Sequence, residues 1–146
     1  SFCEQPPLNL IKSIEMSGCY IVDDDYCLVN RWLKEEVPTE GDPLGNLASA
    51  FLHKSADTAA KYAETEEDVG AQLVATISDN RAEGVIFAAP SFCDPALLDQ
   101  PMLQSALEKA GIPFTSFKYS EDTGQFQVIR EQAGTFADAI KLWGIV

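Results

Sequence analysis

The chain has 146 residues, a length typical of one domain with a sizeable core. Its hydrophobic fraction of 46% and charged fraction of 23% are those of an ordinary globular protein. The 23 acidic and 10 basic residues give a net charge of -13, which excludes nucleic acid as a partner because phosphate binding needs clustered Lys and Arg. No apolar run approaches the ~20 residues of a membrane span, and no signal peptide opens the chain. We therefore expect a cytoplasmic protein with no membrane partner.

The expected elements begin with a helix and a strand. Pro6 and Pro7 are tolerated at the start of a helix, and Gly18 ends it. Residues 19–23 form a short apolar segment that predicts a strand, and this segment leads into three consecutive aspartates at positions 23–25.

Two further helices are predicted before the middle of the chain. Asp42 has the position of an N-cap, and Pro43 follows it at the first helical position. The residues after it follow the i, i+3, i+4, i+7, i+8 template of an amphipathic helix. They are Leu44, Leu47, Ala48, Phe51 and Leu52. Residues 65–68 have the form of a capping box and start a helix that continues through Ile77.

The second half alternates strand and helix. Residues 84–89 are apolar throughout, which predicts an interior strand covered on both faces. We expect a helix restarting at Pro101, a turn at 111–113, a strand at 114–117 and a final helix with an apolar stripe from Ile129 to Trp143. This alternation is typical of an α/β fold with a parallel sheet.

Four cysteines, Cys3, Cys19, Cys27 and Cys93, form no C-x-x-C pair, so a structural zinc site is not indicated. Cys19 and Cys27 lie in apolar surroundings and are interpreted as packed thiols. The pattern Ser-Phe-Cys-acid occurs at residues 1–4 and again at 91–94. Because the second copy follows a strand, we expect the first to follow one too. That strand would lie upstream of Ser1, in a part of the protein that this chain lacks.

Ligands of open α/β sheets bind outside the carboxyl ends of the strands. Residues 1–5, 23–26 and 90–94 are expected at that edge and supply the thiols of Cys3 and Cys93. A thiolate there is a nucleophile or a metal ligand, but the single histidine, His53, is remote in sequence and is interpreted as a surface residue. Iron–sulfur ligation suits these cysteines better than hydrolase chemistry, although a packed or reactive lone thiol stays open at this point.

The three consecutive aspartates do not predict a cation site. Successive residues at a strand end point in alternating directions, so they cannot all reach one ion. We expect Asp24 to pair with Arg31 or to cap a turn. Neither a Walker A sequence nor G-x-G-x-x-G occurs, so nucleotide phosphate loops are not supported.

Several segments resemble a known family. The chain resembles the C-terminal region of the benzoyl-CoA reductase and 2-hydroxyacyl-CoA dehydratase family in three parts. They are residues 2–7 (Phe-Cys-Glu-Gln-Pro-Pro) through 22–25 and 30–31, residues 84–86 leading into 91–95, and residues 112–113 with 132–140. The resemblance covers nearly the whole chain. It implies that residues 1–146 form the single C-terminal α/β domain of a larger subunit whose N-terminal part is absent. We expect a three-layer, Rossmann- or flavodoxin-like domain with a mostly parallel sheet flanked by helices.

The resemblance also implies a cofactor site. Subunits of this family hold a 4Fe–4S cluster between domains, and the cluster would be shared with the missing N-terminal part. Cys93 matches the ligand that comes from a late loop of the C-terminal domain, and Cys3 is a second candidate near the cofactor. Catalytic groups are not assigned. The residues expected near the substrate are Glu4, Asp24, Arg31 and Ser91.

The reaction implied is electron transfer to an acyl-CoA. In this family ATP acts through an iron–sulfur activator protein, and the subunit works with a homologous second subunit. The sequences of residues 3–7 and 23–25 look more like those of the ring-reducing members and favour a benzoyl-CoA reductase of anaerobic aromatic degradation. A 2-hydroxyacyl-CoA dehydratase subunit is the alternative. A non-catalytic α/β module that binds a partner is the second alternative. We expect the isolated fragment to be inactive.

Overall fold

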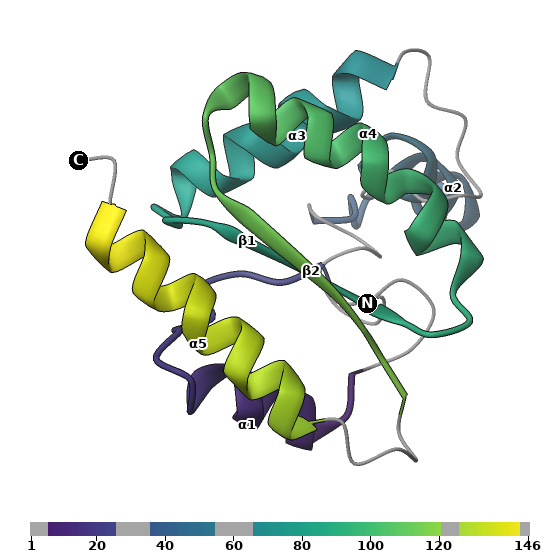
Figure 1. Ribbon diagram of the computed structural model, residues 1–146. Helices are drawn as coiled ribbons and strands as arrows, with labels where there is room; N and C mark the ends of the chain where they lie inside the picture. Colours follow the sequence, from purple (N-terminus) through teal and green to yellow (C-terminus); the bar gives the residue numbers. More distant parts are fainter. Residues whose placement is uncertain (1–5, 26–35, 55–65, 121–125, 144–146) are drawn as a thin grey trace.

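A computed structural model of the chain describes residues 6–25, 36–54, 66–120 and 126–143 (Figure 1). Within these residues the chain forms five helices and a pair of strands. The helices are α1 (Leu8–Glu15), α2 (Pro43–Lys54), α3 (Glu66–Asp79), α4 (Asp94–Ala110) and α5 (Phe126–Trp143). The strands are β1 (Val85–Pro90) and β2 (Phe114–Tyr119). None of the helices in these ranges is long and apolar enough to cross a membrane.

The centre of the fold is a β1–α4–β2 unit. The two strands pair in parallel, with Val85 opposite Phe114 and Pro90 opposite Tyr119. Parallel strands need a long crossover, and α4 supplies it. Figure 1 shows α3 and α4 on one side of the strands and α1 and α5 on the other. The predicted α/β class and parallel pairing are confirmed; the full three-layer Rossmann- or flavodoxin-like sheet stays a prediction.

The strand predicted at residues 19–23 is wrong. The described segment 19–25 forms no strand, although its side chains alternate in exposure. Cys19 and Ile21 pack against the core, whereas Tyr20 is 84% exposed and Val22 48% exposed. Alternation gives a segment one buried face, but a strand also needs a neighbour whose backbone N–H and C=O groups pair with its own. Among the described residues, β1 and β2 pair with each other instead.

Two details of the second half also differ from expectation. The prediction that β1 is covered on both faces is not met in the described part of the chain, since Ala89 is buried and the other residues of β1 are half-buried. The predicted restart of a helix at Pro101 is wrong, because α4 runs through that residue. A proline inside a helix removes one hydrogen bond. The packing of α4 against α3 and the full burial of Leu107 offset that loss.

The main core lies between α1, β2 and α5. It contains five buried side chains, which are Leu10, Ile14, Phe117, Tyr119 and Ile129. The helix start at Pro7 and the turn at Gly111 after α4 were predicted, and both are confirmed; Gly111 has a φ of 71°. The predicted stripe on α5 is confirmed for Ile129 and Ala133, which are buried, whereas the side chain of Trp143 lies outside the described part of the chain. This core fixes β2, whose last residue, Tyr119, is 1% exposed and reaches the edge where β1 also ends.

Candidate functional site

Cys93 lies at the carboxyl end of β1, where the sequence places it. Its N–H donates to the carbonyl of Pro90 at 3.0 Å, which closes a tight turn after the strand. Its own carbonyl accepts a hydrogen bond from the N–H of Leu97 at 3.2 Å, in the first turn of α4. The backbone on both sides of the cysteine is therefore held in place. Cys93 is 3% exposed.

Ser91 ties this turn to the neighbouring strand. Its backbone N–H and its hydroxyl both donate to the carbonyl of Tyr119, each at 2.9 Å. A serine hydroxyl has one hydrogen to donate and two lone pairs to accept. Because that hydrogen is given to Tyr119, Ser91 has acceptor capacity left for a ligand but no second donor. Tyr119 was missed by sequence reasoning, which ended its strand at Phe117; the in–out alternation of residues 117–119 was the signal for the longer strand.

Exposed apolar side chains flank the buried cysteine. Phe92 is 95% exposed, and Leu98, in the first turns of α4, is 77% exposed. Because Cys93 itself is 3% exposed, a ligand can reach its sulfur only after a change of the cysteine rotamer. Rotamer changes between staggered wells are modest in energy. Large apolar side chains around a thiol also keep water away once another polypeptide covers them.

The donors that the structure describes do not make a complete metal site. No group of three His, Cys, Asp or Glu side chains converges in the described ranges. Cys19 is half-buried, and its sulfur lies 3.7 Å from the carbonyl oxygen of Ala133, on α5. This contact agrees with its interpretation as a packed thiol. Cys93 therefore offers one thiolate, the donor type that iron–sulfur clusters use. Cys3, Glu4, Cys27 and Arg31 lie outside the described residues.

The acidic segment is tied to a different part of the fold. The Asp23 carboxylate accepts a hydrogen bond from the side-chain amide of Asn80 at 3.0 Å. It also accepts one from the N–H of Asp24 at 2.9 Å. Asn80 directly follows α3, on the approach to the amino end of β1, whereas Cys93 follows its carboxyl end. This contact does not support the expectation that the loops of Asp24 and Cys93 open on one edge.

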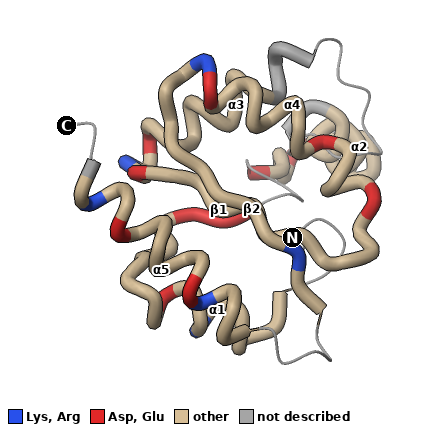
Figure 2. Tube along the Cα trace, viewed as in Figure 1, with Lys and Arg blue, Asp and Glu red and all other residues tan. Residues whose placement is uncertain are grey.

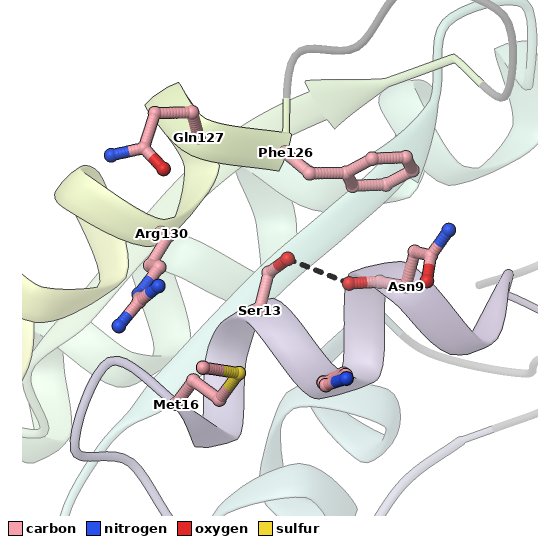
Figure 3. A pocket seen from close by; sticks show the side chains of 7 residues that line it. Asn9, Ser13, Met16, Phe126, Gln127 and Arg130 are labelled. Carbon is pink, nitrogen blue, oxygen red and sulfur yellow. Dashed lines mark hydrogen bonds between the residues drawn. The ribbon is translucent and has the colours of Figure 1, made fainter.

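A shallow pocket between α1 and α5 is separate from these residues (Figure 3). Its lining includes Ser13, Lys12 and Arg130, with no histidine or carboxylate that could act as a base. The Ser13 hydroxyl donates to the carbonyl of Asn9, as the dashed line in Figure 3 shows. None of the residues predicted for the site lies here. Figure 2 shows Lys and Arg scattered among more numerous acidic residues, without a basic patch over the described elements.

Residues 1–140 match the family described as HGD-D, 2-hydroxyglutaryl-CoA dehydratase, D-component. The chain belongs to this family. The resemblance noted in the sequence is thereby confirmed, and the segment after β1 that carries Cys93 lies within the matched region. No solved structure matches the chain.

Three curated proteins are similar to the chain. A subunit of the benzoyl-CoA reductase of Thauera aromatica is 66% identical over 143 residues, which is 98% of this chain and 37% of that protein. The (R)-phenyllactyl-CoA dehydratase beta subunit of Clostridium sporogenes is 26% identical over 90% of the chain and 34% of its own length. The beta subunit of the lactoyl-CoA dehydratase of Anaerotignum propionicum is 25% identical over 92% and 36%. The chain thus spans about a third of the length of these relatives.

Proposed function

We propose that this chain is the C-terminal domain of a subunit of a benzoyl-CoA reductase, an oxidoreductase that transfers electrons to an aromatic acyl-CoA and reduces its ring. The observation that carries the proposal is the 66% identity to the benzoyl-CoA reductase subunit of Thauera aromatica over 98% of the chain. The dehydratase alternative rests on relatives that are 26% and 25% identical. The difference in identity favours the reductase.

Cys93 is proposed as a ligand of a 4Fe–4S cluster shared with polypeptide outside these 146 residues. The donor fits, because a cysteine thiolate is the usual ligand of such clusters, and the chain holds its backbone by hydrogen bonds on both sides. When bound, the cluster supplies one-electron transfer at low potential. The chain's own contribution is to fix the cysteine at the end of β1 and to keep its side chain out of water, since Cys93 is 3% exposed.

The remaining site residues enter the proposal with separate roles. Cys3 would lie near the cofactor, and Glu4 and Arg31 near the substrate. Asp24 would contact a part of the substrate that extends toward the amino end of β1, because its neighbour Asp23 is hydrogen-bonded to Asn80. Ser91 would meet the substrate as a hydrogen-bond acceptor, because its hydroxyl hydrogen is donated to Tyr119. A carboxylate and a guanidinium near an acyl thioester can orient it through charge-assisted hydrogen bonds.

The proposal includes the assembly around the domain. The relatives are named as subunits, which supports a complex with a homologous second subunit. ATP would act through an iron–sulfur activator protein, in the cytoplasm, and this fragment alone would be inactive. Within the larger subunit, β1 and β2 would belong to a wider parallel sheet of the Rossmann or flavodoxin type. The half-buried apolar side chains of β1 support that extension.

A pair of cysteine variants tests the proposal. In the full-length subunit, purified without oxygen, Cys93→Ala should lose most of the cluster iron and abolish reductase activity, because alanine offers no soft ligand. Iron per subunit and electron transfer with the activator present are the measurements. Full iron and activity in this variant would show that Cys93 is a bystander.

Cys19→Ala is the matched control. Cys19 packs half-buried against the core, so its loss should cost about 1 kcal/mol of unfolding free energy and leave the iron content unchanged. Thermal unfolding and iron content are measured on both variants. A colourless, iron-free parent subunit would instead favour the non-catalytic module.

A further inference from the structure

The apolar stripe of α2 faces away from the rest of the described chain. Leu44 is 77% exposed, Leu47 51% and Leu52 53%. An amphipathic helix normally turns such a stripe toward the core of its domain. Monomeric proteins rarely leave a contiguous group of large apolar side chains in water, so a group of this kind marks a site of contact.

The opposite side of α2 is the one that is anchored. The side-chain amide of Asn46 donates two hydrogen bonds of 2.8 Å, to the carbonyls of Pro38 and Glu40. Ala50, four residues after Asn46 and three after Leu47, lies between these two side chains on the helix surface and is 1% exposed. The helix also begins at a fixed point, because the Asp42 carboxylate accepts a hydrogen bond from the N–H of Gly45 at 2.9 Å. Asn46, two residues after Leu44, lies on the opposite side of the helix from it, so these hydrogen bonds leave Leu44 on the open side.

The charge of α2 fits a surface that is covered. The sequence of this helix, Pro43–Lys54, contains no Asp or Glu, although the whole chain has 23. Each of the other helices that the structure describes carries at least one carboxylate. Interface centres are depleted in charged residues for the same reason, since charges lose hydration when they are buried.

We infer that Leu44 and Leu47 dock against the part of the parent subunit that lies outside these 146 residues. The inference rests on the proposed function in that it takes this chain as one domain of a longer subunit. The chain covers 37%, 34% and 36% of the three relatives, so most of each relative lies outside the matched region. Polypeptide joined covalently to the domain has a high effective concentration at this surface, which gives it an advantage over separate partners.

Photocrosslinking in the assembled full-length protein tests the inference. Leu47 is replaced by p-benzoylphenylalanine, and the subunit is purified without oxygen together with its homologous partner. After irradiation, mass spectrometry should identify peptides of the same subunit from outside residues 1–146. The same substitution at Ser49 is the control and should give several-fold less of this product. Ser49 is exposed and, two residues after Leu47, lies on the other side of the helix. Leu44 serves as a second stripe position if the Leu47 variant does not assemble.

Three results would overturn the inference. They are crosslinks from Leu47 to the homologous subunit or to a second copy of this subunit, crosslinks confined to residues 1–146, and no product above the Ser49 control. Mixing isotope-labelled and unlabelled subunits separates a second copy from the same chain. Iron content and reductase activity are measured on the unsubstituted subunit, so a failure of the proposed reductase function would show there and leave the crosslinking result unaffected.

Discussion

Helices α2 and α5 have the same kind of sequence pattern but opposite surroundings. Both carry apolar side chains at helical spacing, and both are helices in the structure. On α5 the stripe is buried, with Ile129 2% and Ala133 0% exposed, whereas on α2 Leu44 is 77% exposed. The comparison teaches that periodicity predicts the helix and its apolar face, but not which polypeptide covers that face. The stripe of α5 packs against α1 and β2 within this chain. We infer that the stripe of α2 packs against polypeptide outside these 146 residues.

The largest expected effect is on the α5 side. Ile129→Ala removes a buried side chain from the core of α1, β2 and α5 and leaves a cavity, so the unfolding free energy should fall by about 3 kcal/mol. Urea unfolding of the 146-residue chain measures the change. A loss close to zero would mean that α5 is not packed as described, and the contrast with α2 would disappear.

Gly84→Ala should have an intermediate effect by pushing α5 away from the strands. A Cβ at Gly84 would lie 2.8 Å from side-chain carbons of both Phe136 and Ile140, and 3.1 Å from the carbonyl oxygen of Pro113. The side chains can yield but the backbone oxygen cannot easily do so, and overpacking of this kind costs about 2 kcal/mol. Urea unfolding again gives the value. Gly111→Ala is no control, because its positive φ adds strain; Gly134→Ala is suitable, since its nearest neighbour would be 3.6 Å away.

Leu44→Ala should have the smallest effect in the 146-residue chain. Its side chain is largely in water already, and alanine is a good helix former, so the unfolding free energy should change by less than about 0.5 kcal/mol. We expect the same substitution to lower the melting temperature of the full-length subunit clearly more than that of the 146-residue chain. That result would strengthen the contrast between α2 and α5. A large loss of unfolding free energy in the 146-residue chain would show that residues of this chain cover the leucines of α2.

Local signals account for much of what the sequence predicted correctly. Asp42 before Pro43 specifies the start of α2, and Gly111 the end of α4, because a cap depends on residues within one turn of it. The strand of residues 84–89 was also found, since an apolar run bounded by Gly and Pro is typical of a strand. Local signals failed at Pro101, where they predict a helix boundary and where packing of α4 against α3 decides otherwise.

The position of Cys93 was predictable for a related reason. A parallel strand followed by a helix places its connecting loop at the carboxyl edge of the sheet, and the sequence shows both elements. The hydrogen bonds from Ser91 to Tyr119 were not predictable, because they join residues 28 positions apart through the register of two strands. The same holds for the contact of Asp23 with Asn80, 57 positions apart, which ties the acidic segment to the end of α3.

By itself, then, the sequence determined the family, the α/β class, the starts of α1 and α2, the end of α4 and the cysteine at the end of β1. These properties follow from residue order and from interactions within a few residues. Tertiary structure alone decided that residues 19–25 form no strand, that Cys93 is buried although its neighbour Phe92 is exposed, and that the leucines of α2 face outward. Each of these depends on which surfaces meet across the fold. Burial of a side chain requires a second surface that covers it, and a local sequence pattern describes only the first surface.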